Sequence, residues 1–176
     1  MSGHNKWSKI KRQKAGTDAA KSKIFSKMAR AISTASRLVN GDATSPTLRA
    51  VIDKAREFNM PTENIERAVK KGSGADAEQL ESITYEAYGP GGSALVIEAL
   101  TGNRNKAAQE VKFILSKQGF SLAAQGSATW AFTKENGEWK PNMTVQLSEE
   151  DEAVLEKLME ELEDNEEVQE VYTNAE

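Results

Sequence analysis

"SITYEAYGPGGSALVIEALTGNRNKAAQEVKFILSKQ" (residues 82–118) is the stretch of this chain that decides the fold. Residues 82–88 and 93–100 are rich in β-branched, aromatic and apolar residues and are typical of strands, and the glycines at 89–92 indicate a turn between them. From residue 103 the apolar residues recur at steps of three and four, which is typical of a helix. The stretch therefore predicts a strand, a turn, a second strand and a helix.

The sequence beyond residue 118 predicts the rest of the same domain. Residues 127–134 have a strand pattern, and Asn136-Gly137 is a hairpin-turn signal that lets residues 138–147 pair back. Pro141 confines the second of these strands to an edge or splits it. Ser148 is a helix N-cap signal, and residues 167–174 read as a closing strand. The order ββαββαβ predicts an α+β sandwich with a mostly antiparallel sheet and helices on one face.

The sequence before residue 82 has helical periodicity. Thr17 or Asp18, Ser45-Pro46 and the region of Thr62 are helix starts, while Gly41 and Gly72 are helix stops. Three amphipathic helices with short connections predict a small helical domain. The expected organisation is a basic flexible arm (1–16), a helical domain (17–72), a linker (73–80) and an α+β domain (81–176).

Composition excludes several kinds of site. The chain has 176 residues, no Cys and a single His, His4, so disulfides, thiolate metal sites, multi-His metal sites and His-based triads are excluded. His4 itself is expected to make a polar contact. No apolar run approaches a membrane span, and the basic N-terminus lacks the apolar core of a signal peptide. We expect a cytoplasmic protein that is not an enzyme, with no cofactor, no metal and no membrane partner.

Charge is distributed very unevenly along the chain. Residues 1–71 hold 16 Lys/Arg and 6 Asp/Glu, a balance of +10, whereas residues 72–176 carry −14, which gives a net charge of −4. The helix after Thr17 is expected to have one apolar and one basic face, and a cationic arm precedes it. This pattern predicts contacts to nucleic-acid phosphates, with Trp7 stacking on an unpaired base. The candidate contact residues are Lys6, Trp7, Lys9, Lys11, Arg12, Lys14, Lys21, Lys23, Lys27, Arg30 and Arg37.

Three other features have more ordinary interpretations. The segment 88–93 could cradle a phosphate, but it lacks the Walker lysine and the Rossmann spacing, so a tight turn is expected. Asn103 is expected to cap a helix, whereas Arg104 opposes the helix dipole there and is a candidate for a ligand or an acidic neighbour. The acidic stretch 149–170 is expected to be a solvated face, with repulsion of nucleic acid as a second interpretation.

Four stretches resemble the YebC family: residues 3–30, 48–72, 85–111 and 168–174. Its members are named probable transcriptional regulatory proteins, and the family includes the mitochondrial translational activator of cytochrome c oxidase subunit I. The resemblance implies a helical N-terminal domain, no enzyme activity, and control of gene expression by DNA binding or by a ribosome-associated role that relieves proline-rich stalls. It also marks a second region whose role is open: Tyr85, Tyr88, Gly89, Pro90, Gly91, Gly92, Asn103, Arg104 and Asn105.

The resemblance has one gap. Typical members carry an additional α/β domain between the segments that correspond to Phe132 and Pro141, so a compact member lacking that domain is expected, with the Asn136-Gly137 turn closing the gap. The expected partner is DNA or ribosomal RNA, including the ribosome, and an adaptor that binds an acidic protein is the other alternative. A monomer is favoured.

Overall fold

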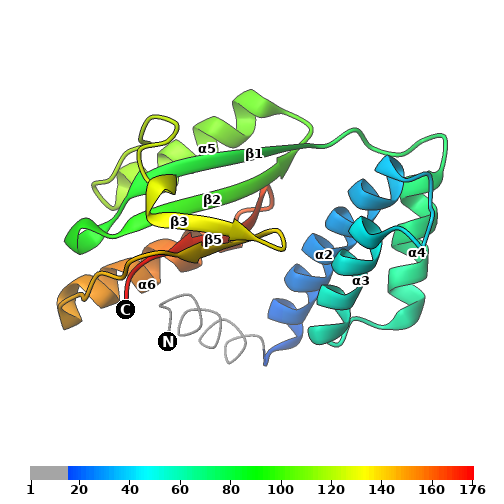
Figure 1. Ribbon diagram of the computed structural model, residues 1–176, viewed down its shortest axis with the longest axis horizontal. Helices are drawn as coiled ribbons and strands as arrows, with labels where there is room; N and C mark the ends of the chain where they lie inside the picture. Colours follow the sequence, from blue (N-terminus) through cyan, green and yellow to red (C-terminus); the bar gives the residue numbers. More distant parts are fainter. Residues whose placement is uncertain (1–15) are drawn as a thin grey trace. The chain divides into compact units, whose positions relative to one another are not determined.

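The structure is a computed structural model of the chain, and it describes residues 16–176. These residues form two compact units, which we call the helical unit (up to Glu81) and the α/β unit (Ser82–Glu176). Figure 1 traces the elements of each. The predicted basic arm lies, except for Gly16, outside the described residues. An α+β fold with a helical N-terminal part, as predicted from the sequence, is confirmed.

The helical unit contains α2 (Asp18–Leu38), α3 (Pro46–Glu57) and α4 (Thr62–Ser73). The N-cap predicted before α2 is confirmed, because the Thr17 hydroxyl accepts a hydrogen bond from the backbone N–H of Ala20 at 3.2 Å. Each helix has one apolar stripe, and the three stripes share a core because none can be buried alone. The fully enclosed members of this core are Ile32, Leu48 and Ala55.

α4 ends at Ser73, one residue beyond the stop predicted at Gly72. Gly72 is buried inside the helix, and a Cβ placed on it would lie 2.2 Å from the carbonyl oxygen of Ser33. Two hydroxyls of α2 reach across the same contact: Ser33 donates to the Ala68 carbonyl at 3.0 Å, and Ser36 donates to the Val69 carbonyl at 2.6 Å. Glycine is therefore required for the close approach of two helix backbones.

The α/β unit is built on a three-stranded sheet in the order β1-β2-β5. Its strands are β1 (Glu81–Tyr88), β2 (Ala94–Thr101) and β5 (Val168–Thr173), and β2 pairs antiparallel with β5. A short 3₁₀ turn, η1 (Pro90–Gly92), joins β1 to β2. The central strand β2 is buried along nearly its whole length, which places apolar side chains on both faces of the sheet.

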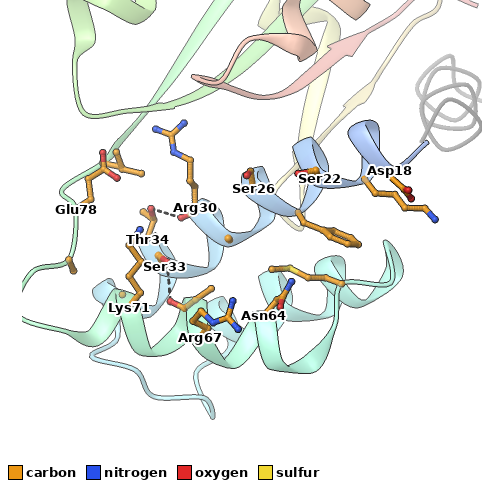
Figure 2. Close-up of a pocket in the computed structure, with 18 residues that line it drawn as sticks. Asp18, Ser22, Ser26, Arg30, Ser33, Thr34, Asn64, Arg67, Lys71 and Glu78 are labelled. Carbon is orange, nitrogen blue, oxygen red and sulfur yellow. Dashed lines mark hydrogen bonds between the residues drawn. The ribbon is translucent and has the colours of Figure 1, made fainter. Parts of the chain in front are cut away.

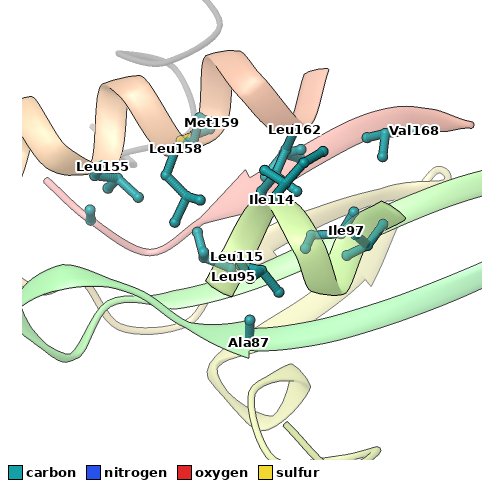
Figure 3. Packing of buried hydrophobic residues seen from close by; sticks show 13 residues of the cluster. Ala87, Leu95, Ile97, Ile114, Leu115, Leu155, Leu158, Met159, Leu162 and Val168 are labelled. Carbon is teal, nitrogen blue, oxygen red and sulfur yellow. The ribbon is translucent and has the colours of Figure 1, made fainter. Parts of the chain in front are cut away.

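Two helices, α5 (Arg104–Lys117) and α6 (Glu149–Asp164), pack on one face of this sheet. Figure 3 shows their apolar side chains meeting those of β2. The apolar spacing predicted for α5 is confirmed, since Val111, Ile114 and Leu115, the residues expected to face inward, are buried. The largest enclosed members of this core are Leu95, Ile97, Val111, Leu115, Leu155, Leu158, Leu162, Val168 and Val171.

A β-hairpin packs against residues of the opposite face, as a separate two-stranded sheet. It consists of β3 (Phe132–Glu135) and β4 (Glu138–Pro141), preceded by the 3₁₀ turn η2 (Thr129–Ala131). Positive φ angles at Asn136 (51°) and Gly137 (82°) confirm the predicted hairpin turn. Phe132 of the hairpin joins a cluster with Ala94 and Val96 of β2 and Tyr172 of β5.

The strand predicted over 127–134 is shorter than expected and begins only at Phe132. The cause is Glu86 of β1, whose buried carboxylate accepts backbone N–H groups from Gly126 (2.6 Å), Ala128 (2.9 Å) and Thr129 (2.7 Å). These donors are therefore unavailable to a strand ladder, and the chain turns instead.

Candidate nucleic-acid interface

The predicted contact residues divide into two sets. The arm residues lie outside the described residues, and their role stays a prediction: Lys6, Trp7, Lys9, Lys11, Arg12 and Lys14. The other five, Lys21, Lys23, Lys27, Arg30 and Arg37, all lie on α2.

The basic residues of α2 are spread around much of the helix. At 100° per residue, Lys23, Arg30 and Arg37 fall opposite the side that carries the core residues Met28, Ile32 and Ala35, and Lys27 lies about 100° from that side. Lys23 is exposed, while Lys27 and Arg37 are half-buried. Lys21 and Arg30 also line a groove.

This groove lies between α2 and α4 and has a volume of about 710 Å³. We call it the α2–α4 groove; it is lined by Phe25 and Arg30 of α2, by Arg67 and Lys71 of α4, and by Glu78 of the segment that follows. Figure 2 shows Arg30 on α2, with Arg67 and Lys71 coming from α4. No residue of α3 belongs to its lining, although Met60 and Ala68 of the shared helical core border the groove.

Basic side chains outnumber acidic ones around the groove. Lys21, Arg30, Arg67 and Lys71 contribute positive charge, whereas the acidic lining residues are Asp18 and Glu78. Arg67 also pairs with Glu63 one turn earlier on α4, at 3.1 Å, but both side chains are mostly exposed, so this pairing is weak. The groove therefore favours an anionic ligand.

The glycine-rich turn of the second marked region has a structural explanation. Gly91 has φ of 63°, and a Cβ there would lie 2.5 Å from Leu147 and 3.2 Å from the carboxylate of Asp151. The Ser93 hydroxyl donates to the Pro90 carbonyl at 2.8 Å and closes the turn. A tight turn packed against the start of α6 agrees with the interpretation favoured from the sequence.

Asn103 caps α5, as predicted. Its side chain accepts a hydrogen bond from the backbone N–H of Lys106 at 3.1 Å. The Thr101 hydroxyl donates to the Asn103 carbonyl at 3.0 Å and accepts from the Asn103 N–H at 2.9 Å. Arg104 and Asn105 are exposed in the first turn. The structure does not bring this group together with the glycine turn, since the two lie at opposite ends of β2, about 25 Å apart for a strand of this length.

Sequence reasoning missed an aromatic pair on the α/β unit. Tyr88 donates its hydroxyl to the Ser127 carbonyl and accepts the indole N–H of Trp130 at 3.0 Å, while the Trp130 side chain stays 59% exposed. The Glu86 carboxylate fixes the loop that carries both partners. Its burial opposes ionisation, but the three backbone N–H groups outweigh that effect and hold its pKa below the usual value.

The groove residues Phe25, Arg67 and Lys71 were also missed. Their spacing along the chain carries no motif, and only the packing of α2 on α4 brings them together. Over residues 16–176, no group of three or more Asp, Glu, His or Cys side chains is arranged to hold a metal ion. Within the same range, no helix has the length and apolar character needed to cross a membrane.

Sequence models of one protein family match nearly the whole chain. The TACO1/YebC protein N-terminal domain matches residues 5–75, and the TACO1/YebC second and third domain matches residues 80–137 and 134–175. The two stretches of the second match meet at residues 134–137, on the turn between β3 and β4. The absence of the additional domain of typical members between residues 133 and 141 stays a prediction.

Curated relatives carry one recurring name. The chain is 55% identical over 137 residues to a "Probable transcriptional regulatory protein" of Fervidobacterium nodosum, covering 77% of this chain and 54% of that protein. A protein of the same name from Trichlorobacter lovleyi is 44% identical over 175 residues, covering 98% of this chain and 70% of that protein. The chain spans about half the length of the curated relatives that it matches over 137 residues.

The fold also matches a solved structure, that of a conserved hypothetical protein from Aquifex aeolicus. The TM-score is 0.78 at 32% sequence identity, and the match covers 92% of this chain and 93% of that one. The resemblance inferred from the sequence is confirmed by these findings. Because the family models cover both the helical unit and the α/β unit, the chain belongs to the TACO1/YebC family.

Proposed function

We propose that this protein is a non-enzymatic regulator of gene expression that binds nucleic acid through its helical unit and basic arm. The observation that carries the proposal is the charge division, +10 over residues 1–71 against −14 over residues 72–176. Phosphates attract the cationic half and release their counterions on binding, which drives association with any sequence. The names of the relatives, probable transcriptional regulatory proteins, agree with such a role.

The contacts are to phosphate rather than to base edges. Lys23, Lys27 and Arg37 carry positive charge on α2, and the arm ahead of Thr17 supplies five further basic candidate residues. Neither the helix nor its spacing corresponds to a base-reading motif, so these residues position the protein without selecting a sequence. The acidic α6 belongs to the half that a polyanion repels, which restricts nucleic acid to the basic half.

Two nucleic-acid targets fit this chemistry. The first is duplex DNA, as the names of the relatives suggest for a transcriptional regulator. The second is RNA, including ribosomal RNA, in a factor that assists translation. The α2–α4 groove favours the second, because a groove of about 710 Å³ has the size of a small-ligand site and cannot enclose a duplex.

The direct test is binding of the full chain to short RNA and duplex DNA of several unrelated sequences, measured by fluorescence anisotropy. A variant with Lys9, Lys11, Arg12 and Lys14 all changed to Ala should bind every sequence more weakly, by a similar factor. Selective loss for one sequence would indicate base reading instead. If the chain binds neither polymer but binds an acidic protein, the adaptor alternative is correct. Co-sedimentation with ribosomes, compared with crosslinking to chromosomal DNA, separates the two targets.

A further inference from the structure

We propose that the α2–α4 groove is a binding site for one unpaired nucleotide, with its base inside the groove and its phosphates on the basic rim. The inference rests on the proposed function and deepens it. Contacts between basic side chains and a phosphate backbone do not require an apolar groove, so the groove is assigned a ligand of its own. The groove is lined wholly by the helical unit, so the site does not depend on the α/β unit.

The groove is held open by the way the two helices cross. At one end, the backbone of Gly72 touches that of Ser33, and the hydroxyls of Ser33 and Ser36 donate to carbonyls of α4. This contact fixes the spacing of α2 and α4 without large side chains. The space beside it is then bordered by small residues of α2, among them Ser26 and Ala29. A preformed cavity of about 710 Å³ lies within the usual range of small-ligand sites, roughly 300–1,000 Å³.

The lining combines the two kinds of contact that a nucleotide needs. Phe25, Met60 and Ala68 give an apolar, partly aromatic surface for the flat face of a base. Ser22 and Ser26 add hydroxyl groups that can pair with the edge of a base.

Basic side chains at the edge of the groove would bind the phosphates of the nucleotide. Arg67 and Lys71 lie one turn apart on α4, whereas Arg30 lines the groove from α2 with its side chain directed away from α4. Side chains of both signs line the groove, but the basic ones are in excess, so an anionic occupant is favoured. An apolar floor under a cationic rim fits a planar base that carries an anionic phosphate, and the volume fits one nucleotide outside a duplex.

The chain offers a matched pair of variants to test the site. The groove variant combines Arg67→Ala and Lys71→Ala. The control combines Arg56→Ala and Lys70→Ala, which removes the same charge and likewise one exposed Arg–carboxylate pair within a helix, Arg56 with Asp53 at 3.3 Å. Neither control residue lines the groove.

The experiment measures binding of both variants to a short single-stranded RNA of mixed sequence and to its duplex, across a range of salt concentrations. The groove variant should lose about tenfold or more in affinity for the single strand relative to the control. Its salt slope should fall by about 1.4, since each lost phosphate contact on a single strand removes about 0.7. Affinity for the duplex should change equally in both variants.

The base contact has its own variant. Phe25→Leu keeps an apolar side chain but removes the ring, and should weaken single-strand binding by about fivefold to a hundredfold with little change in salt slope. Circular dichroism confirms that the variant is folded. Equal losses for groove and control variants, or an equal loss of duplex binding in the groove variant, would overturn the site while leaving the proposed function intact. Absence of binding by the wild-type chain would instead overturn the proposed function itself.

Discussion

Gly72 of α4 lies directly on the backbone of Ser33 in α2, so closely that a Cβ at Gly72 would be 2.2 Å from the Ser33 carbonyl oxygen. This contact sets the spacing of the two helices that border the α2–α4 groove. We therefore expect Gly72→Ala to destabilise the helical unit by about 2 kcal/mol, although alanine is the better helix former by about 1 kcal/mol. Calorimetric unfolding of the variant measures the loss.

Gly74, two residues further along, is the control for this substitution. A Cβ there would find its nearest neighbour at 3.5 Å, and the residue has an ordinary φ of −78°. Gly74→Ala should leave the free energy of unfolding within about 0.5 kcal/mol of the wild-type value. Equal stability of the two variants would show that the helices can separate at no cost and that the groove has no fixed width.

Glu86 should make the stability of the α/β unit depend on pH. Burial disfavours its charged form, but three backbone N–H groups lower its pKa overall, so its contribution is present above the carboxyl pKa of the unfolded chain and is lost as pH falls through the folded pKa. Glu86→Gln should cost about 1–3 kcal/mol at pH 7, and much less in acid, where the wild-type carboxyl is also uncharged. Urea unfolding followed by the fluorescence of Trp130 and Trp139 measures the difference. If the difference in the free energy of unfolding between the wild type and Glu86→Gln does not change with pH, the charge of the carboxylate does not contribute to stability.

Asn103 should act on stability and not on binding. Because its side chain caps α5, Asn103→Ala should lower the free energy of unfolding by about 1 kcal/mol, whereas Asn103→Asp keeps the cap. Anisotropy titrations of both variants with RNA should match the wild type. A loss of affinity in a fully folded Asn103→Asp protein would assign a ligand contact to this residue.

The basic side of α2 should carry part of the phosphate binding. Changing Lys23, Lys27 and Arg37 to Ala should reduce the slope of log affinity against log salt by about 2.1–2.7, because each contact contributes about 0.7–0.9. The control changes three basic residues of α3 in the same unit, Arg49, Lys54 and Arg56, to Ala. If the α3 variant loses as much slope as the α2 variant, the charge acts through the whole unit rather than through this side of the helix.

Local signals in the sequence predicted most of the elements. Asn136-Gly137 predicted its turn, because few residues other than Asn and Gly adopt two successive positive φ angles. Ser148 predicted the start of α6, and its hydroxyl accepts the N–H of Asp151 at 3.2 Å. Such signals act within a few residues, so they are visible without knowledge of the fold.

Contacts between distant residues could not be predicted in the same way. Glu86 reads as an ordinary polar residue of an alternating strand, yet it fixes a loop about 40 residues later by capturing its N–H groups. Gly72 reads as a helix stop and lies one residue from the end of α4, but its close approach to Ser33 depends on tertiary packing. The α2–α4 groove depends on that packing, so its residues carry no motif, whereas the basic charge of α2 was visible from composition and helical spacing alone.

The measurement that tests the central claim most directly is the salt dependence of nucleic-acid binding by the full, unmodified chain. Anisotropy titrations with a short single-stranded RNA and with duplex DNA over a range of salt concentrations give the slope of log affinity against log salt. Neutralisation of about five or more phosphates by the basic half predicts a slope of about −3.5 or steeper on the single strand. A slope near zero, or no binding to either polymer at low salt, would contradict the account.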